Sequence, residues 1–138
     1  MRLREISPPG VLSVWPHARQ YVMEAVRYED PEYSELDIVN FLMSGVLTLF
    51  VMEGEKIAGA VVVSIHEYPM TKRCRIRWCG GEDMDDWIAL IADVETWAAQ
   101  QGCSSVRISG RKGWERVLPD YAHAGVILVK RLDNENAH

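Results

Sequence analysis

Residues 47–65, LTLFVMEGEKIAGAVVVSI, decide the fold of this chain. They contain two runs of β-branched and apolar residues, 47–52 and 57–65, on either side of the polar tetrapeptide EGEK. β-Branched side chains favour the pleated surface of a sheet, and a short connection that contains glycine allows the chain to reverse. The stretch therefore predicts an antiparallel β-hairpin.

A third strand is predicted at residues 73–78, where arginines alternate with apolar residues. Successive side chains of a strand point to opposite faces, so one face is expected to be charged and the other packed. The charged face would hold Arg73, Arg75 and Arg77, and the packed face Cys74, Ile76 and Trp78.

Beyond this strand, residues 79–86, CGGEDMDD, lead into a predicted helix that stops at Gly102. Apolar residues recur there at helical spacing, namely Trp87, Leu90, Ile91, Val94, Trp97 and Ala98. A further strand is predicted at 104–109, with Val106 and Ile108 inward. A strand–helix–strand unit of this kind requires a crossover connection.

Before the hairpin, a short strand at residues 3–6 is followed by a helix over 13–28, with Ser13 as its cap and Pro16 in its first turn. A second helix begins at Ser34, which has Asp37 at capping-box spacing, and ends at Gly45. The inner face of this second helix is expected to carry Leu36, Val39, Asn40 and Met43.

After the hairpin and crossover, residues 110–118 predict a short helix and residues 126–132 a final strand, while the polar residues 133–138 are expected to fray. The predicted order is β-α-α-β-β-β-α-β-α-β over a single domain, residues 1–138. This is an α/β (α+β) fold, a mixed β-sheet flanked by helices.

Composition excludes several classes of protein. The chain has 138 residues, 48% of them hydrophobic, and a formal charge of −5, which argues against a nucleic-acid backbone as the main partner. Its three cysteines, Cys74, Cys79 and Cys103, form no paired C-x-x-C spacing, and its histidines are scattered, so no disulfide framework and no metal site is predicted. No apolar run approaches a spanning helix and no signal peptide is recognised, so the expected location is cytoplasmic, without membrane contact.

The order of elements, above all in residues 49–65 and 78–130, resembles the GNAT N-acetyltransferase fold. The chain also resembles small phage-encoded proteins of GNAT type in Gly80-Gly81-Glu82-Asp83 and in residues 110–116, GRKGWER. The resemblance implies transfer of an acetyl group from acetyl-CoA to an amine, carried by a small molecule or a protein. It places the protein in the cytoplasm, which would be the host's if the chain is phage-encoded.

The resemblance also implies where coenzyme A binds. In the family, the turn after the central strand and the following helix N-terminus hold the pyrophosphate, because backbone N–H groups and the helix dipole attract an anion. In this sequence Trp78, Cys79, Gly80 and Gly81 take that place, and Arg111 would contact the nucleotide phosphate.

Candidate catalytic groups are His66, Glu67 and Tyr121. His66 is the expected general base, since imidazole titrates near neutrality and the adjacent Glu67 carboxylate could orient it. The resemblance implies a tyrosine acid in the last short helix, but Trp114 stands near that place and its indole N–H cannot act as an acid. Tyr121 is therefore the expected acid.

Two alternatives remain open at this point. The carboxylates at 82–86 would repel a pyrophosphate and also suit a simple helix cap, which favours a catalytically inactive GNAT-like phage protein that acts in virion assembly or binds a viral or host protein. The second alternative is a nucleic-acid-directed regulator that uses the basic residues 107–116, although the net charge argues against it.

Overall fold

The computed structural model describes residues 2–29, 32–82, 84–109, 118 and 120–133, without the side chains of residues 84–88. In this part of the chain, five strands form one sheet in the order β1-β2-β3-β4-β5. The strands are β1 (Arg2–Ile6), β2 (Leu47–Glu53), β3 (Ile57–Glu67), β4 (Lys72–Gly81) and β5 (Ser105–Ile108). All neighbours pair antiparallel except β4 and β5, which are parallel. The predicted mixed sheet and hairpin are confirmed.

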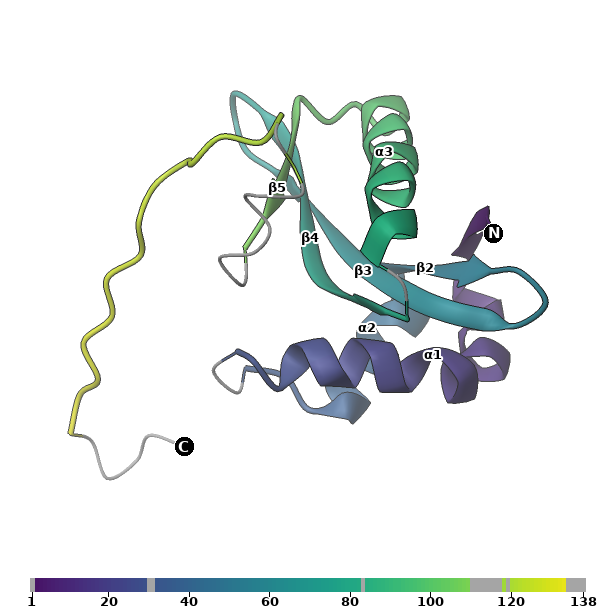
Figure 1. Ribbon diagram of the computed structural model, residues 1–138. Coiled ribbons are helices and arrows are strands. Elements are labelled where there is room, and N and C mark those ends of the chain that lie inside the picture. Colours follow the sequence, from purple (N-terminus) through teal and green to yellow (C-terminus); the bar gives the residue numbers. More distant parts are fainter. Residues whose placement is uncertain (1, 30–31, 83, 110–117, 119, 134–138) are drawn as a thin grey trace.

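Helices cover both faces of the sheet (Figure 1). A 3-10 turn, Pro8–Gly10, leads into α1 (Val11–Val26), and α1 lies with α2 (Glu35–Ser44) on one face, whereas α3 (Met84–Gln100) lies on the other. The helix α3 provides the crossover between the parallel strands β4 and β5, as the strand–helix–strand pattern predicts.

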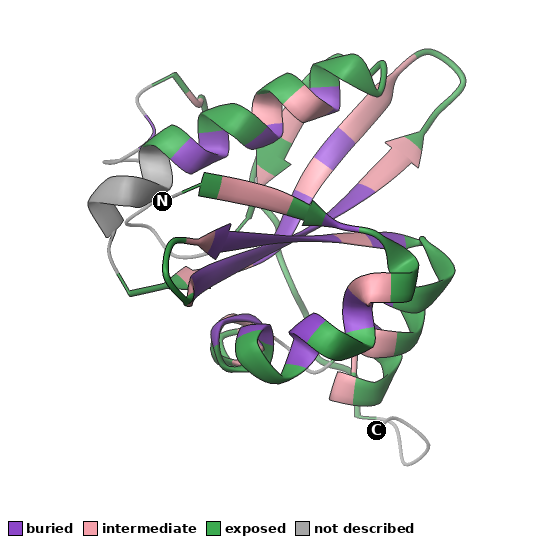
Figure 2. Cartoon of the chain, turned by 90° about the vertical axis from the view of Figure 1, so that its right-hand side faces the viewer, coloured by how far each residue is buried: buried purple, intermediate pink, exposed green. Residues whose placement is uncertain are grey.

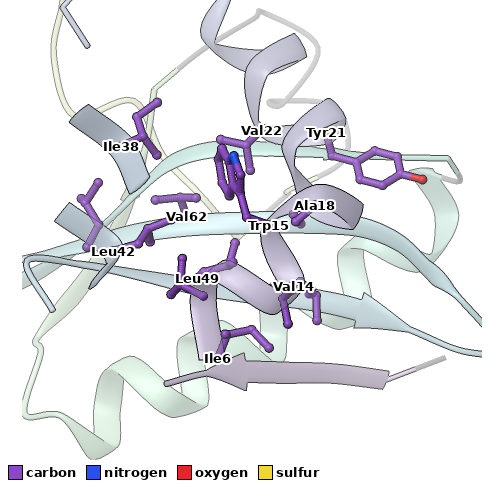
Figure 3. Packing of buried hydrophobic residues seen from close by; sticks show 14 of the residues in the cluster. Ile6, Val14, Trp15, Ala18, Tyr21, Val22, Ile38, Leu42, Leu49 and Val62 are labelled. Atoms are coloured by element: carbon purple, nitrogen blue, oxygen red, sulfur yellow. The ribbon is translucent and has the colours of Figure 1, made fainter. Parts of the chain in front are cut away.

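Two hydrophobic clusters fill the space on either side of the sheet. The first lies under α1 and α2 and includes Trp15, Val22, Leu42, Leu49 and Val62. Figure 3 shows residues of α1, α2, β1, β2 and β3 converging in it. The second cluster lies under α3, and its fully buried members include Met52, Val61, Val63, Ile76, Ile91 and Val94. The burial colours in Figure 2 follow the same division, with buried positions on the inner sides of the helices.

The start of α1 corrects one prediction. Gly10 is the N-cap, and the hydroxyl of Ser13 lies inside the first turn, where it donates to the Gly10 carbonyl at 3.0 Å. Pro16 lies one turn farther in, on the exposed side of the helix. The helix begins earlier than predicted because the 3-10 turn feeds straight into it and buries Val11 against the sheet.

The ends of α2 are as predicted, but its inner face is not. Ser34 and Asp37 form the reciprocal capping box, and Gly45 ends the helix at a positive φ of 82°. The buried residues are Ile38 and Leu42. Of the four residues predicted, Val39 is half-buried against the first cluster, whereas Leu36 is 68% exposed, Met43 is 43% exposed and Asn40 is exposed. Apolar residues occur all round this short helix, so the contacts with α1 and β2, and not the periodicity, decide which of them are buried.

Replacing Ser34 by alanine is expected to lower the free energy of unfolding by about 1 kcal/mol, because it removes the acceptor for the Asp37 backbone N–H. The matched variant Ser13→Ala is expected to change it by no more than a few tenths of a kcal/mol, since Ser13 caps nothing. Urea unfolding of both variants measures the difference. Equal losses would contradict the assignment of the caps.

The strand β4 is longer than predicted and contains a β-bulge. It runs to Gly81, and the register against β3 shifts so that Ile76 faces Val63 and Trp78 faces Val62. Arg77 is the extra residue. The bulge breaks the alternation expected from the sequence, so Ile76 packs in the second cluster while Trp78 packs in the first.

The last predicted strand is wrong as an element of this sheet. Residues 126–132 have extended backbone without a strand partner in the described part of the chain, and they lead away from the sheet (Figure 1). The predicted helix at 110–118 lies outside the described residues except for Leu118, which is buried. No helix in the described ranges is both long enough and apolar enough to cross a membrane.

Candidate active site

The parallel strands β4 and β5 separate where β4 bulges. Their pairing ends at Ile76 and Ile108, while β4 continues through Arg77 to Gly81 along β3. We call this point the fork. Beyond it, among the described residues, the edge of β4 that faces away from β3 has no strand partner. Free backbone N–H and C=O groups at a strand edge can bind an extended, amide-containing ligand.

At the fork, the bulge places an arginine in a buried aromatic pocket. Arg77 is 8% exposed, and its guanidinium carbon lies 5.2 Å from the ring centre of Tyr33 and 5.1 Å from that of Trp78. Its Nη2 atom is 3.6 Å from the Glu32 carboxylate, and neither Nε nor Nη2 has a hydrogen-bond partner in the described part of the chain. A buried cation with unused donors is suited to an anionic or carbonyl oxygen.

The acidic segment before α2 closes over this site. Glu29 accepts a hydrogen bond from the indole N–H of Trp78 at 3.0 Å, and Tyr33 packs edge-on against the same indole at 5.5 Å. Glu35, at the start of α2, accepts from Trp15 at 2.9 Å and from Arg19 at 2.9 and 2.7 Å. These carboxylates hold the segment against α1 and β4. Their partners lie on β4 and α1, distant in sequence, so the spacing of residues does not predict these contacts.

Because Glu35 is paired with Arg19, the free energy of unfolding is expected to depend on pH in the acidic range. Hydrogen bonds from Arg19 and then Trp15 lower the pKa of Glu35 from 4.5 to about 2. A carboxyl group with a depressed pKa in the folded state stabilises the protein above its unfolded pKa, and this contribution is lost as the pH falls from about 5 to about 2. Chemical denaturation at pH 7, 4 and 3 should therefore show a smaller pH dependence in Glu35→Gln than in the unmodified protein. Parallel curves would refute this role of Glu35.

His66 lies on the same face of the sheet as Arg77. It faces Arg73 across β3 and β4, and its Nε2 atom is 2.8 Å from the Ser64 hydroxyl, which fixes the ring. Burial lowers the pKa of His66 below 6.5, and the positive charges of Arg75 and Arg77 lower it further. The imidazole is consequently neutral at physiological pH and can accept a proton.

The partner of His66 is not the one expected. Successive strand residues point to opposite faces, so Glu67 lies on the other side of β3, where it is exposed and pairs with Lys72 at 3.4 Å. Glu67 cannot orient the imidazole. Ser64, two residues before His66 and on the same face, does so instead, and period-two spacing was the signal in the sequence that could have identified it.

Tyr121 lies under α3, packed against the second cluster. Its hydroxyl donates to the Glu95 carboxylate at 2.5 Å, and burial together with Glu95 raises the pKa of Tyr121. The hydroxyl proton is thus held by a carboxylate on the α3 face. The catalytic role of Tyr121 as an acid stays a prediction, and the observed contact is that of an anchor.

The residues expected to bind coenzyme A lie in β4 and not in a turn. The side chain of Trp78 is 2% exposed in the first cluster, and Cys79 packs against the second cluster, where burial raises the pKa of its thiol well above the usual value. Their side chains are therefore used in packing against the two clusters. What they can offer is backbone along the edge of β4 beyond the fork.

Gly80 and Gly81 are also strand residues, which corrects their placement in a phosphate-binding turn. Gly80 faces Ala60 and Gly81 faces Gly59 in the ladder with β3. A Cβ atom at Gly80 would lie 2.5 Å from the Tyr21 carbonyl oxygen, so this glycine is required for close packing of α1 on β4. The turn itself begins at Glu82, whose carboxylate accepts from the Tyr21 hydroxyl at 3.0 Å.

The predicted residues are not all brought together. Gly80 and the position opposite His66, Arg73, are seven residues apart on β4, a separation of roughly 20 Å along a strand. Arg111 lies outside the described residues. A surface hollow of about 380 Å³ is bordered by Arg19, Tyr21, Lys56 and Glu82, on the α1 side of the sheet and away from the fork. The described residues contain no group of three or more side chains suited to hold a metal.

Sequence comparisons leave this chain without a match, whereas structural comparison finds several. No family model matches the chain, and no curated protein does. Similar solved structures include a ribosomal-protein-alanine N-acetyltransferase from Brucella melitensis biovar Abortus 2308, with 10% identity, a TM-score of 0.69 and coverage of 96% of this chain and 100% of the other.

Two further structures give the same result. An aminoglycoside acetyltransferase from an uncultured soil metagenomic sample, solved with sisomicin, has 11% identity and a TM-score of 0.69 over 96% of each chain. A predicted acetyltransferase from Clostridium acetobutylicum, solved with acetyl-CoA, has 11% identity and a TM-score of 0.64 over 96% of this chain and 95% of the other. Together with the sheet order, the crossover and the fork, these likenesses show that the chain has the fold of the GNAT acetyltransferases.

Proposed function

We propose that this protein transfers the acetyl group of acetyl-CoA to an amine. The observation that carries the proposal is the fork, where β4 leaves β5 at a bulge and keeps a free edge beside a buried arginine. The pantetheine arm of acetyl-CoA contains two amides, which can pair with a free strand edge in the manner of an added strand. A predicted acetyltransferase of similar structure has been solved with acetyl-CoA, which supports acetyl-CoA as the ligand.

The reaction needs few groups from the protein. The amine nitrogen attacks the thioester carbonyl carbon, the C–S bond breaks, and the nitrogen loses one proton while the sulfur leaves as a thiolate and gains one. A thiol has a pKa near 8.5, so the thiolate is a good leaving group that water can protonate. The protein contributes mainly by holding both reactants in place, together with donors directed at the carbonyl oxygen.

In this proposal His66 takes the proton of the amine. The neutral imidazole lies on the face that carries Arg77, about 10 Å from the fork along the strand, so the proton would reach it through a chain of several water molecules. The unused donors of Arg77 face the developing oxyanion or an anionic group of the acceptor. Backbone of Trp78, Cys79 and Gly81 would hold the pantetheine arm, and Arg111 the nucleotide phosphate.

The acceptor is proposed to be a small molecule with a primary amine. Tyr33 and the carboxylates of Glu29 and Glu32 border the fork on the acceptor side, and carboxylates attract ammonium groups. Neighbours that are aminoglycoside acetyltransferases support a small amine. A protein amine is the other acceptor to test, because one neighbour is a ribosomal-protein-alanine N-acetyltransferase.

Two measurements test the proposal. Titration calorimetry with acetyl-CoA is expected to show binding to the unmodified protein and to His66→Gln alike, since His66 does not touch the cofactor edge of β4. Thiol release in the presence of a panel of amines, including sisomicin and an alanine-ended peptide, is expected to be about 100-fold slower with His66→Gln than with the unmodified protein. Absence of heat at millimolar acetyl-CoA would refute the proposal.

A second candidate function is favoured by Glu82. Its carboxylate stands directly after β4, held by Tyr21 and 4.0 Å from the Lys56 ammonium, where a pyrophosphate would approach α3. Like charges at that position oppose coenzyme A binding. In this second candidate function, the protein is a catalytically inactive GNAT-like protein that binds another protein. Titration with acetyl-CoA would then release no heat, and a partner protein would co-purify in stoichiometric amount.

A further inference from the structure

Arginines gather on the face of the sheet that carries α1 and α2, between the fork and the β3–β4 turn. The parallel register sets Arg107 of β5 directly beside Arg75 of β4. The residues on either side of Arg75 and of Arg107 pack in the second cluster, so both arginines point to the opposite face. We call this set the arginine face, and its members are Arg73, Arg75, Arg77 and Arg107.

The positive charge of the arginine face has few partners. The chain carries 20 acidic residues against 15 basic ones, yet among the described residues only one carboxylate, that of Glu32, forms an ion pair there, 3.6 Å from Arg77. Arg75 donates to the neutral hydroxyl of Ser109 at 3.2 Å. Like charges on directly opposite strand residues are destabilising, so Arg75 and Arg107 together lower the stability of the sheet. A bound anion would offset this effect.

The arginine face is open, and an aromatic ring borders its outer end. Arg107 is exposed and Arg73 is half-buried. Near the β3–β4 turn, the ring of Tyr68 lies 5.2 Å from the guanidinium of Arg73 and stacks with His66 at 6.4 Å. Figure 1 shows this turn well away from α1 and α2. The planar donors of arginine match the oxygens of a phosphate or a carboxylate, so the face is suited to an oxyanion.

His66 lies within the field of the arginine face. It faces Arg73 across the two strands, and burial, followed by the charges of Arg75 and Arg77, lowers the pKa of its imidazole. The positive charges therefore reach the group that is proposed as the base. An anion bound among them would raise this pKa, and that change can be measured in the absence of acetyl-CoA.

The positions of the charges set a length for the acceptor. The carboxylates of Glu29 and Glu32 lie at the fork and attract an ammonium group. Arg75 lies two residues before Arg77, roughly 7 Å away along the strand, with Arg107 beside it. An acceptor that reaches both places therefore carries its anion roughly 7 Å from its amine.

We infer that Arg75 and Arg107 bind an oxyanion of the acceptor, a phosphate ester or a carboxylate, while the acceptor amine lies at the fork. The anion-binding part stands on the arginine face alone, whereas the assignment of the anion to the acceptor rests on the proposed acetyl transfer. A small acceptor is favoured over a nucleic acid, because the net charge of −5 repels a polyanion beyond this face.

Binding without acetyl-CoA is the first test, with hexyl phosphate and hexanoate as probes. In a titration followed by NMR, either probe is expected to shift the guanidinium Nε–H signals of Arg75 and Arg107 and to raise the pKa of His66. Hexyl phosphate is expected to bind more tightly, since a dianion pairs with both guanidiniums, and tighter binding of hexanoate would assign a carboxylate. No shift with either probe at millimolar concentration would overturn the inference.

Two variants locate the bound anion. Arg107→Gln is expected to weaken hexyl phosphate binding about tenfold, the effect of one charge-assisted hydrogen bond. Arg2→Gln is the matched control, because Arg2 is also an exposed arginine on an edge strand but lies on β1, at the opposite edge of the sheet. Equal affinities of the two variants would overturn the site. A single-stranded DNA oligonucleotide that binds more tightly than hexyl phosphate, and loses this advantage in Arg107→Gln, would overturn the small acceptor.

Thiol release then tests whether the anion belongs to the acceptor. Aminohexyl phosphate is expected to exceed hexylamine in kcat/KM about tenfold, and Arg107→Gln is expected to remove this advantage without changing the rate with hexylamine. Equal rates with both amines would leave acetyl transfer standing and overturn the role of the anion. Binding of hexyl phosphate through Arg107 without acetylation of any amine would confirm the anion site and overturn both acetyl transfer and the acceptor assignment.

Discussion

Gly80→Ala is expected to lower the free energy of unfolding by about 3 kcal/mol, enough to reduce the melting temperature by about 10 °C. The new Cβ atom would lie 2.5 Å from the carbonyl oxygen of Tyr21 and 3.1 Å from its carbonyl carbon. Both are backbone atoms of α1, so no side-chain rotation relieves the clash. The helix must move away from β4, which loosens the first cluster around Trp15 and Val62.

Gly54→Ala is the matched control for this effect. A Cβ atom at Gly54, in the turn between β2 and β3, would meet no described heavy atom within 4 Å, and its φ is not among the positive values. Thermal unfolding followed by circular dichroism compares the two variants. A melting temperature of Gly80→Ala within 2 °C of that of Gly54→Ala would show that α1 does not approach β4 this closely.

His66→Gln is expected to lower kcat of amine acetylation about 100-fold while leaving acetyl-CoA affinity unchanged. The loss is the contribution usual for a general base, because glutamine can keep the hydrogen bond to Ser64 but cannot accept a proton. Burial lowers the pKa of His66 below 6.5, so the rate should be level at neutral pH and fall as the pH drops through that lowered pKa. This acidic limb should be absent from the residual activity of the variant.

His17→Gln provides the comparison, since His17 is an exposed histidine of α1. Its kcat and pH profile are expected to match those of the unmodified protein. Melting temperatures of both variants separate a chemical effect from a loss of fold. A His66→Gln variant that retains more than half of kcat, with the acidic limb intact, would exclude His66 as the base.

Several local features could be predicted because each depends on neighbouring residues only. The hairpin over 47–65 follows from two β-branched runs and a short turn, and the cap of α2 follows from Ser34 and Asp37 at the required spacing. The crossover between β4 and β5 follows from a strand–helix–strand pattern. These are the elements that identified the GNAT-like order.

The errors have a shared cause, since each depended on contacts distant in sequence. Gly80 was assigned to a phosphate-binding turn, but its partner is the backbone of Tyr21, about sixty residues earlier, and a glycine doublet alone does not distinguish the two uses. Charged and apolar residues alternate regularly from Arg73 to Trp78, so the sequence gives no sign of the bulge at Arg77. A bulge moves every later residue of the strand to the opposite face of the sheet. Residues 126–132 have the composition of a strand, yet pairing requires an edge that can be reached.

The sequence by itself determined the hairpin, the capping of α2 and the parallel crossover, because these follow from local spacing and intrinsic chemistry. It also suggested His66 as a proton acceptor, which stays a proposal. Only the tertiary structure decided that Arg77 is buried against Tyr33 and Trp78, that Ser64 rather than Glu67 holds His66, and that Gly80 serves packing. A side chain's partner depends on the bulge and on how helix and sheet pack, and both result from the whole chain folding at once.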